Sequence, residues 1–243
     1  MAKWKKGLAA GLLALSALAL SAAQLGAPAR TQAVLEEVKL PAGPYVALTF
    51  DDGPRAATTT PLLDGLARRG VHATFFVIGE NVEGNELLLQ RMEGEGHQVG
   101  LHTYHHKSLD GLNASDFYAE VDQLRETLTA LLGRTDFMLR PPYGMMSPAA
   151  QARAAAPIIL WSVDPEDWSD RDTGRQTAAI LDNVKDGDII LLHDIYPASV
   201  DTALQVVDAL MAQGYHFVTV EELFAIRGRT PERGAVYRRL PPD

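Results

Sequence analysis

Residues 45–54, YVALTFDDGP, contain the pattern that decides the fold of this chain. The first six residues are uncharged and mostly apolar or β-branched, which is typical of a strand buried on both faces. Two acids, Asp51 and Asp52, follow at once, and Gly53 and Pro54 form a turn signal. Adjacent acids repel each other, and a turn needs only one of them. The stretch therefore fits either a plain turn or a site in which one carboxylate holds a metal ion and the other acts as a base.

Further short apolar runs alternate with helical patterns along the rest of the chain. The predicted strands cover residues 73–78, 98–101, 137–140, 158–163, 188–192 and 216–220. Alternating strands and helices predict an α/β fold with a parallel sheet and right-handed crossovers. Seven strands in about 200 residues suit either a barrel or an open doubly wound sheet. The Gly-, Pro- and Arg-containing residues 227–243 are expected to form a surface tail.

The ends of three helices are also predicted. Ser and Thr favour helix N-caps, Pro favours the first helical position, and Gly favours the residue after the helix. These rules assign Thr60 and Gly70, Ser115 and Gly133, and Ser199 and Gly214 as the starts and stops of helices.

Composition excludes several classes of protein. With 0 Cys in 243 residues, the chain has no disulfide framework, no thiolate zinc site and no cysteine nucleophile. Any metal must therefore be held by His and carboxylates. The formal charge of −9 argues against a nucleic-acid partner, because such partners require clusters of Lys and Arg.

The N-terminus reads as an export signal. Residues 1–6 are MAKWKK, and the uncharged run 7–23 ends in small residues, with cleavage expected before Gln24. We therefore expect a signal peptide over 1–23, a tether over 24–40 and a catalytic domain over 41–243, exported or held at the cell envelope. An uncleaved anchor is the alternative, although the run is at the short end of the ~17–25 residues that span a bilayer. After cleavage no stable membrane span is expected.

Polar clusters follow five of the predicted strands. Because parallel strands open their carboxyl ends at one end of the fold, these clusters should converge. They are Asp51-Asp52, His102-Thr103-Tyr104-His105-His106, Arg140-Pro141-Pro142-Tyr143-Gly144, Asp164-Pro165-Glu166-Asp167-Trp168 and His193-Asp194.

The spacing of His102 and His106 favours a metal site. On a helical turn, two imidazoles four residues apart share one face. The alternative is a polar stretch with scattered histidines, but three His in five residues argue against it. Two His and one Asp are a common set of ligands for catalytic zinc, and Co²⁺ also fits these donors. No Glu follows His102, so a general base must come from elsewhere in the chain, and Asp51 or Asp52 can supply it.

Other polar residues each allow two interpretations. Arg140 is either structural or holds a nearby carboxylate ionised. His193 is either structural or the acid for a leaving amine, with a neighbouring carboxylate keeping it protonated. Trp168 is either core or a wall for an apolar substrate group, and the Tyr143 amide could face a developing oxyanion.

Five ordered motifs resemble those of a known family. They are Thr49-Phe50-Asp51-Asp52-Gly53-Pro54, His102-Thr103-x-x-His106, Arg140-Pro141-Pro142-Tyr143-Gly144, Asp164-x-x-Asp167-Trp168 and Leu191-x-His193. In this order they resemble the motifs of the polysaccharide deacetylases (carbohydrate esterase family 4), over roughly residues 45–224. The resemblance implies a distorted (β/α) barrel of about seven parallel strands and a metal-dependent deacetylase.

The resemblance also implies a role for each motif residue. Asp52, His102 and His106 would bind Zn²⁺. Asp51 would be the base, oriented by Arg140, and His193 the acid, tuned by Asp167. The substrate acetyl group would meet Leu191, Trp168 and the Tyr143 amide.

The implied substrate is an acetylated glycan. The segment from His193 to Tyr196, followed by Ser199, looks most like bacterial peptidoglycan deacetylases. We therefore expect removal of N-acetyl groups from N-acetylglucosamine residues of peptidoglycan or a chitin-like envelope polysaccharide, by a monomer. An O-acetyl esterase acting on xylan or a related glycan is the alternative, and a non-catalytic glycan-binding module is a third possibility.

Overall fold

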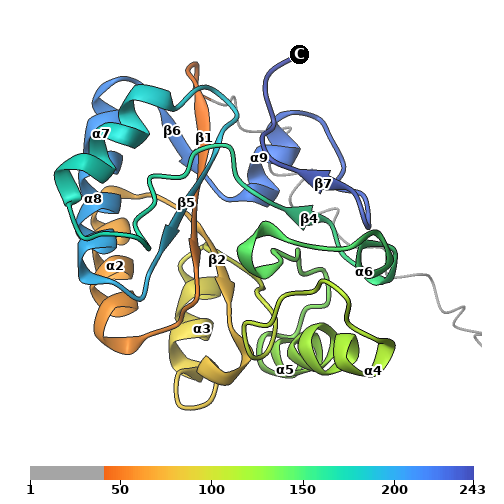
Figure 1. Cartoon of the computed structure of the whole chain (residues 1–243). Coiled ribbons are helices and arrows are strands. Elements are labelled where there is room, and N and C mark those ends of the chain that lie inside the picture. The colour runs from red at the N-terminus through yellow and green to blue at the C-terminus, as the bar shows by residue number, and fades with distance from the viewer. Residues whose placement is uncertain (1–40) are drawn as a thin grey trace, which may run out of the picture.

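The computed structural model describes residues 41–243, so the expected signal peptide (1–23) and tether (24–40) lie outside the described residues. Strands and helices alternate along this part of the chain, as expected for a parallel α/β fold (Figure 1). Within residues 41–243, no helix combines the length and apolar character needed to cross a bilayer.

The main sheet is built around β1 (Tyr45–Asp51), the strand that opens the analysis above. All pairings in this sheet are parallel, and its order is β3 (Gln98–Leu101), β2 (Thr74–Val77), β1, β5 (Ile189–His193). The first half of β1 also pairs with β6 (His216–Val218). The register places Asp51 beside His193, so two of the polar clusters begin at the same level of the sheet.

The expected barrel of seven strands is confirmed only as a parallel α/β fold. Five strands form the main sheet, while β4 (Ile158–Ile159) and β7 (Val236–Tyr237) form a separate pair. The predicted strand 137–140 contributes only single bridges at Leu139, and Val163 makes one bridge to β5. Two prolines follow Arg140, and because proline has no N–H, the ladder cannot continue through them. No regular closed barrel is present among residues 41–243.

Helices cover the outside of the sheet. Their bounds are α2 (Ala56–Arg69), α3 (Glu86–Gly94), α4 (Ala114–Phe117), α5 (Gln123–Leu132), α6 (Pro148–Arg153), α7 (Thr173–Asn183), α8 (Pro197–Ala212) and α9 (Val220–Ile226). A π-helical turn, η2 (Tyr118–Asp122), joins α4 to α5, and short 3₁₀ turns occur at η1 (Gly79–Asn81) and η3 (Pro142–Gly144). Helices α7, α8, α2, α3 and α5 pack side by side in this order (Figure 1).

Helix ends were predicted better at the C-terminus than at the N-terminus. Gly70 and Gly133 end their helices in the left-handed conformation, with φ of 63° and 71°, as expected. The predicted N-cap Thr60 is wrong: α2 begins at Ala56, because the carbonyl of Arg55 already accepts bonds from the amides of Thr58 and Thr59.

The other two predicted N-caps are also wrong. Asn113 rather than Ser115 caps α4, since its side chain accepts from the Asp116 amide at 2.9 Å. Ser199 lies inside α8, which begins at Pro197 and ends at Ala212, shortly before Gly214. Its hydroxyl is used for a tertiary contact described below.

The expected surface tail is also wrong in part. Residues 236 and 237 form β7 on β4, and Leu240 is buried. Arg239 bridges Asp188 in the loop before β5. Tyr237 and Leu240 therefore pack into a hydrophobic cluster, which the Gly, Pro and Arg content of the segment had obscured.

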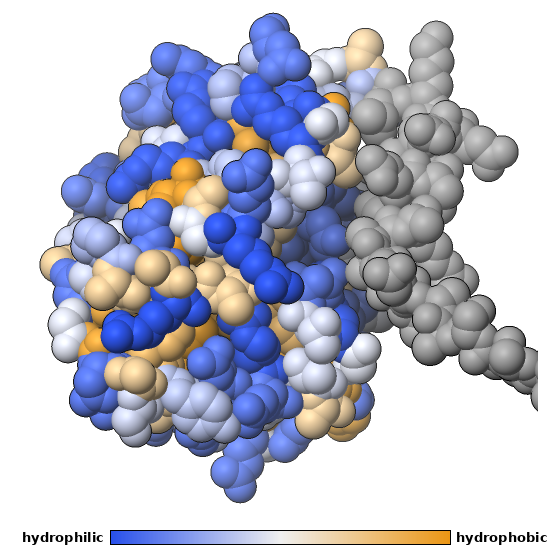
Figure 2. Space-filling model, turned by 90° about the vertical axis from the view of Figure 1, so that its right-hand side faces the viewer, coloured by the Kyte–Doolittle hydropathy of each residue, from blue (hydrophilic) through white to orange (hydrophobic). Residues whose placement is uncertain are grey.

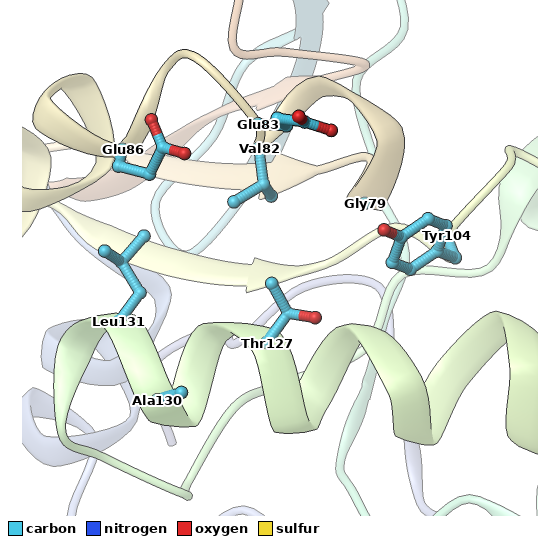
Figure 3. A pocket seen from close by; sticks show the side chains of 8 residues that line it. All are labelled: Gly79, Val82, Glu83, Glu86, Tyr104, Thr127, Ala130 and Leu131. Atoms are coloured by element: carbon cyan, nitrogen blue, oxygen red, sulfur yellow. The ribbon is translucent and has the colours of Figure 1, made fainter.

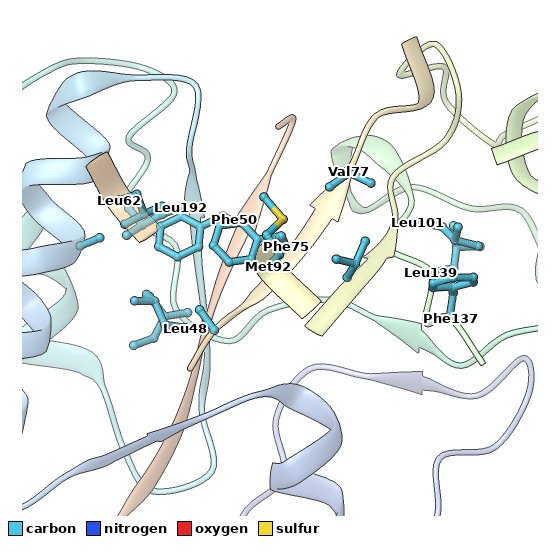
Figure 4. Close-up of a cluster of buried hydrophobic side chains, with 14 of the residues drawn as sticks. Leu48, Phe50, Leu62, Phe75, Val77, Met92, Leu101, Phe137, Leu139 and Leu192 are labelled. Atoms are coloured by element: carbon cyan, nitrogen blue, oxygen red, sulfur yellow. The ribbon is translucent and has the colours of Figure 1, made fainter. Parts of the chain in front are cut away.

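The core gives the two faces of β1 different characters. Leu48 and Phe50 pack with Leu62 of α2 and Phe75 of β2 between the sheet and the helices (Figure 4). Because side chains alternate along a strand, Thr49 and Asp51 lie on the opposite face.

The outer face of the molecule to the right of Figure 1 is mainly hydrophilic, with small hydrophobic patches (Figure 2).

Candidate active site

The carboxyl ends of the strands bring three predicted ligands together. Asp52 Oδ1 lies 3.4 Å from His102 Nε2 and 3.3 Å from His106 Nε2. In residues 41–243 this is the one group of three His, Cys, Asp or Glu whose ligand atoms all lie within 4.8 Å of one another. Residues 50 positions apart in the chain thus form one cluster of nitrogen and oxygen donors.

The backbone at this cluster is held in an unfavourable conformation. Asp52 and His106 have φ of 72° and 55°, in the left-handed region that non-glycine residues seldom occupy. Such conformations persist only where the surroundings enforce them, and they concentrate at functional sites. Asn81 Nδ2 donates to the Asp52 carbonyl at 2.8 Å and helps to hold the backbone of Asp52 in this conformation.

The donor set fits a divalent cation. Asp52 Oδ1 is buried and has no hydrogen-bond partner among the described residues. His102 Nδ1 lies 2.8 Å from the Arg140 carbonyl, which can only accept, so Nδ1 carries the proton and the Nε2 lone pair faces Asp52. Burial lowers the pKa of His106, which favours its neutral, ligating form. Two imidazole nitrogens and one carboxylate leave further coordination positions for substrate or water.

Asp51 is held by a fully buried arginine. Arg140 Nη1 donates to Asp51 Oδ1 at 2.8 Å and to Thr49 Oγ1 at 2.8 Å. The rest of the guanidinium donates to the carbonyls of Ile159 and Leu160. Burial lowers the pKa of Arg140 and the charge of Asp51 opposes this change, but an arginine remains protonated in proteins. The other Asp51 oxygen lies 3.7 Å from His102 Nε2.

His193 forms a second charge pair. Its Nδ1 lies 2.8 Å from Asp167 Oδ1, and its backbone amide donates to Asp167 Oδ2 at 2.8 Å. The hydroxyl of Ser199 donates to the same Oδ2. Burial lowers the pKa of His193, but Asp167, with smaller contributions from Asp51 and Asp52, raises it to about 9. His193 is therefore protonated at neutral pH.

Of the remaining predicted residues, Tyr143 contacts this cluster, and Trp168 and Leu191 lie close in sequence to Asp167 and His193. The Tyr143 ring is exposed and meets the His106 ring edge-on, with centroids 4.9 Å apart, and Tyr143 has a φ of 61°. Trp168 follows Asp167 and is 54% exposed, so the core interpretation of this residue is wrong. Leu191 is buried in β5, on the same face as His193 two residues later.

A cavity of about 330 Å³ lies beside the cluster rather than in it. It is open to solvent between η1 and α3 on one side and α5 on the other, and Tyr104 forms one wall (Figure 3). None of the predicted site residues lines it. Tyr104, which lies between His102 and His106 in the sequence, lines this cavity, whereas the proposed ligands do not.

Sequence reasoning missed several residues that support the site. Thr49, which accepts a bond from Arg140, was recognised only as part of a motif. Its position could have indicated this role, because residues two apart in a strand share one face and Thr49 precedes Asp51 by two. Ser199 was assigned to a helix cap, and its contact with Asp167, 32 residues away, leaves no local pattern. Glu120 could have been found, because it is an acid on the apolar face of a predicted helix.

Comparisons with known proteins place the chain in a family. A family model described as polysaccharide deacetylase matches residues 39–157. The solved structure of the "T48 deacetylase with substrate" is 40% identical, covering 80% of this chain and 96% of that chain, with a TM-score of 0.76. The chain belongs to the polysaccharide deacetylase family. A family 4 acetyl xylan esterase from Clostridium thermocellum, solved with a cobalt ion, is 29% identical and covers 81% of this chain and 99% of that chain, with a TM-score of 0.77.

Curated relatives within this family act on peptidoglycan. The peptidoglycan-N-acetylglucosamine deacetylase PgdA of Listeria monocytogenes is 42% identical over 185 residues, which are 74% of this chain and 38% of PgdA. The peptidoglycan-N-acetylmuramic acid deacetylase PdaC of Bacillus subtilis is 37% identical over 192 residues, which are 79% of this chain and 41% of PdaC. The chain therefore spans about two fifths of the length of these relatives.

Proposed function

We propose that this polysaccharide deacetylase is a metal-dependent hydrolase that removes N-acetyl groups from N-acetylglucosamine residues of peptidoglycan or a chitin-like envelope polysaccharide. The observation that carries the proposal is the cluster of Asp52, His102 and His106 beside Asp51, which Arg140 orients. The names of PgdA and PdaC support the substrate class.

Asp52, His102 and His106 would hold the metal, for which we propose Zn²⁺, with Co²⁺ as an alternative that the cobalt complex of the xylan esterase supports. When bound there, the metal supplies a Lewis acid for the acetyl carbonyl and for the attacking water. The Arg140 carbonyl orients His102, and Asn81 orients Asp52.

Asp51 is proposed as the general base. One carboxylate oxygen of Asp51 lies 3.7 Å from His102 Nε2, and Arg140 binds the other at 2.8 Å, which orients the carboxylate to accept the proton of the attacking water. The Tyr143 backbone amide, in a turn next to His106, is proposed to donate to the oxyanion that develops on the acetyl oxygen.

His193 is proposed as the general acid. It carries a proton at neutral pH that it can donate to the departing amine, and Asp167, itself fixed by Ser199, keeps it protonated and oriented. Leu191 and Trp168 are proposed to form the wall that receives the acetyl methyl group.

The rate of amide hydrolysis should fall at high pH. His193 is active in its protonated form, so turnover should decrease as the pH rises through about 9, the pKa of His193. In an Asp167→Asn variant the group that raises this pKa is gone, and the descending limb should move to lower pH. Initial rates of acetate release across pH 6–11 would measure both. An unchanged limb in Asp167→Asn would contradict the role of this pair.

The proposed function is tested most directly by acetate release. We expect the chain to release acetate from purified peptidoglycan or chitin oligomers, to lose this activity with a chelator and to regain it with Zn²⁺. Acetylated xylan is the third substrate of the panel. No acetate from any of the three, with Zn²⁺ bound, would exclude the proposed function.

An O-acetyl esterase acting on xylan or a related glycan is the second candidate, because the cobalt-bound acetyl xylan esterase is similar in structure over most of this chain. An alcohol leaves more readily than an amine, so an esterase depends less on the protonated His193. Acetate from acetylated xylan but not from the amide substrates would favour this candidate.

We also propose the organisation of the whole chain. Residues 1–23 act as a signal peptide, 24–40 as a tether, and 41–243 as a catalytic domain that acts as a monomer in the cell envelope or outside the cell. For the fold, the parallel bridges at Leu139 and Val163 support a strongly distorted barrel of about seven strands.

A further inference from the structure

Glu120 is a buried acid outside the site described so far. Its side chain is 1% exposed and lies on the π-helical turn η2, beside Val121 and between the buried Phe117 and Leu124. A buried carboxylate is costly unless it is paired and hydrogen-bonded. Glu120 therefore needs partners, and all of those that the structure shows come from one loop.

The partners of Glu120 are the two neighbours of His106. Glu120 Oε2 accepts from the His105 backbone amide at 2.9 Å, and Oε1 lies 3.0 Å from His105 Nδ1 and 3.1 Å from Lys107 Nζ. Burial raises the pKa of Glu120, but the bonds from His105 and Lys107 outweigh it and hold that pKa below its usual value. An ionised carboxylate thus binds the residues on both sides of His106.

These contacts flank one of the two residues of the loop, Thr103 and His106, that have a positive φ. His106 has a φ of 55°, which a relaxed loop would leave, and in this conformation its Nε2 lies 3.3 Å from Asp52 Oδ1. The earlier part of the loop is held separately, because the amides of Gly79 and Glu80 donate to the carbonyls of Thr103 and Tyr104. Glu120 accordingly holds the half of the loop that carries the second imidazole.

The carboxylate itself is fixed by the core. Phe117, Val121 and Leu124 anchor η2 and its flanking helices in the main hydrophobic cluster. Single π-helical turns are uncommon and often occur at functional sites. The loop is therefore tied to a rigid, packed element and not to another loop.

We propose that Glu120 is a positioning residue that sets the geometry of His106 as a metal ligand, by binding His105 and Lys107 on either side of it. The proposal rests on the metal role of His106 in the proposed function. It extends the site to a helix that contributes no ligand.

The test compares Glu120→Gln with Glu126→Gln in the full chain. Glu126 is exposed on α5, where its carboxylate accepts from Tyr118 and does not contact the loop. Zn²⁺ affinity of the metal-free proteins is measured by competition with a chromophoric chelator, and the Co²⁺ forms are compared by visible absorption. Loss of groups that orient metal ligands typically weakens metal affinity ~10–100-fold. We expect a loss of this size and an altered Co²⁺ spectrum for Glu120→Gln, and a change below about twofold for Glu126→Gln.

A second variant covers the case in which Glu120→Gln does not fold. The side chains of His105 and Lys107 are 44% and 63% exposed, so the double variant His105→Ala, Lys107→Met should retain the fold. It keeps the bond from the His105 amide, and we expect about tenfold weaker Zn²⁺ binding. Zn²⁺ affinity within twofold of the original in this variant, or in a folded Glu120→Gln, would overturn the proposal. This test measures metal binding, whereas the proposed function is tested by acetate release. The role of Glu120 can therefore be refuted while acetate release is still observed.

Discussion

Replacing Asp51 with Asn is expected to lower acetate release ~10²–10⁴-fold, the range typical of a lost general base, while Zn²⁺ binding is retained. Asn has nearly the same shape but cannot accept the proton from water. The cluster of Asp52, His102 and His106 does not include Asp51, so its donors are unchanged. Turnover would be measured as acetate release, and bound Zn²⁺ by elemental analysis of the purified protein.

The comparison variant is His102→Ala, which removes one of the two imidazoles. It should lose both Zn²⁺ and turnover, since two donors remain of the three that converge. The assigned roles would be refuted if both variants kept equal zinc content and near-normal acetate release.

Replacing Arg140 with Met should lower the free energy of unfolding by about 3–5 kcal/mol. Arg140 is fully buried and pairs with Asp51 at 2.8 Å, so its removal leaves a buried carboxylate without its counter-charge. The carbonyls of Ile159 and Leu160 also lose their donor. Urea denaturation of the metal-free protein, followed by circular dichroism, would measure the change.

An exposed ion pair supplies the matched control. Arg69 and Asp208 lie at a similar distance, 2.7 Å, but both are partly exposed, so Arg69→Met should cost about 1 kcal/mol or less. Adding Asp51→Asn to Arg140→Met should recover part of the lost stability, because the carboxylate that had lost its counter-charge is then removed. Equal costs for Arg140→Met and Arg69→Met would show that the buried pair contributes little beyond an exposed one.

Much of the site could be predicted because its signals are local. A buried strand that stops at Asp51 and Asp52 can be recognised within ten residues, and so can the four-residue spacing of His102 and His106. Strand direction then required these clusters to meet, which the structure confirms for Asp52, His102 and His106. The chemical roles of these residues stay predictions until the variants above are measured.

Helix starts and the sheet were harder to predict. Three residues suit an N-cap by residue type: Thr60, Ser115 and Ser199. In the structure, the Arg55 carbonyl accepts the first bonds of α2, and the Asn113 side chain caps α4. The Ser199 hydroxyl instead donates to Asp167 from within α8. The apolar run 137–140 suits a strand as well as the others do, yet it forms only single bridges. The helix starts thus depend on which atoms supply the first hydrogen bonds, and the strand is limited by the two prolines that follow Arg140.

The sequence by itself determined the α/β class and the residues that gather at the ends of the strands, because periodicity and turn chemistry act over a few residues. The family resemblance anticipated Arg140 on Asp51 and Asp167 on His193, which the structure pairs. Only the tertiary structure revealed Ser199 on Asp167 and Glu120 on the His106 loop. The partners in these last two pairs lie 32 and 15 residues apart. Packing of the whole core sets such distances, so no local pattern could reveal them.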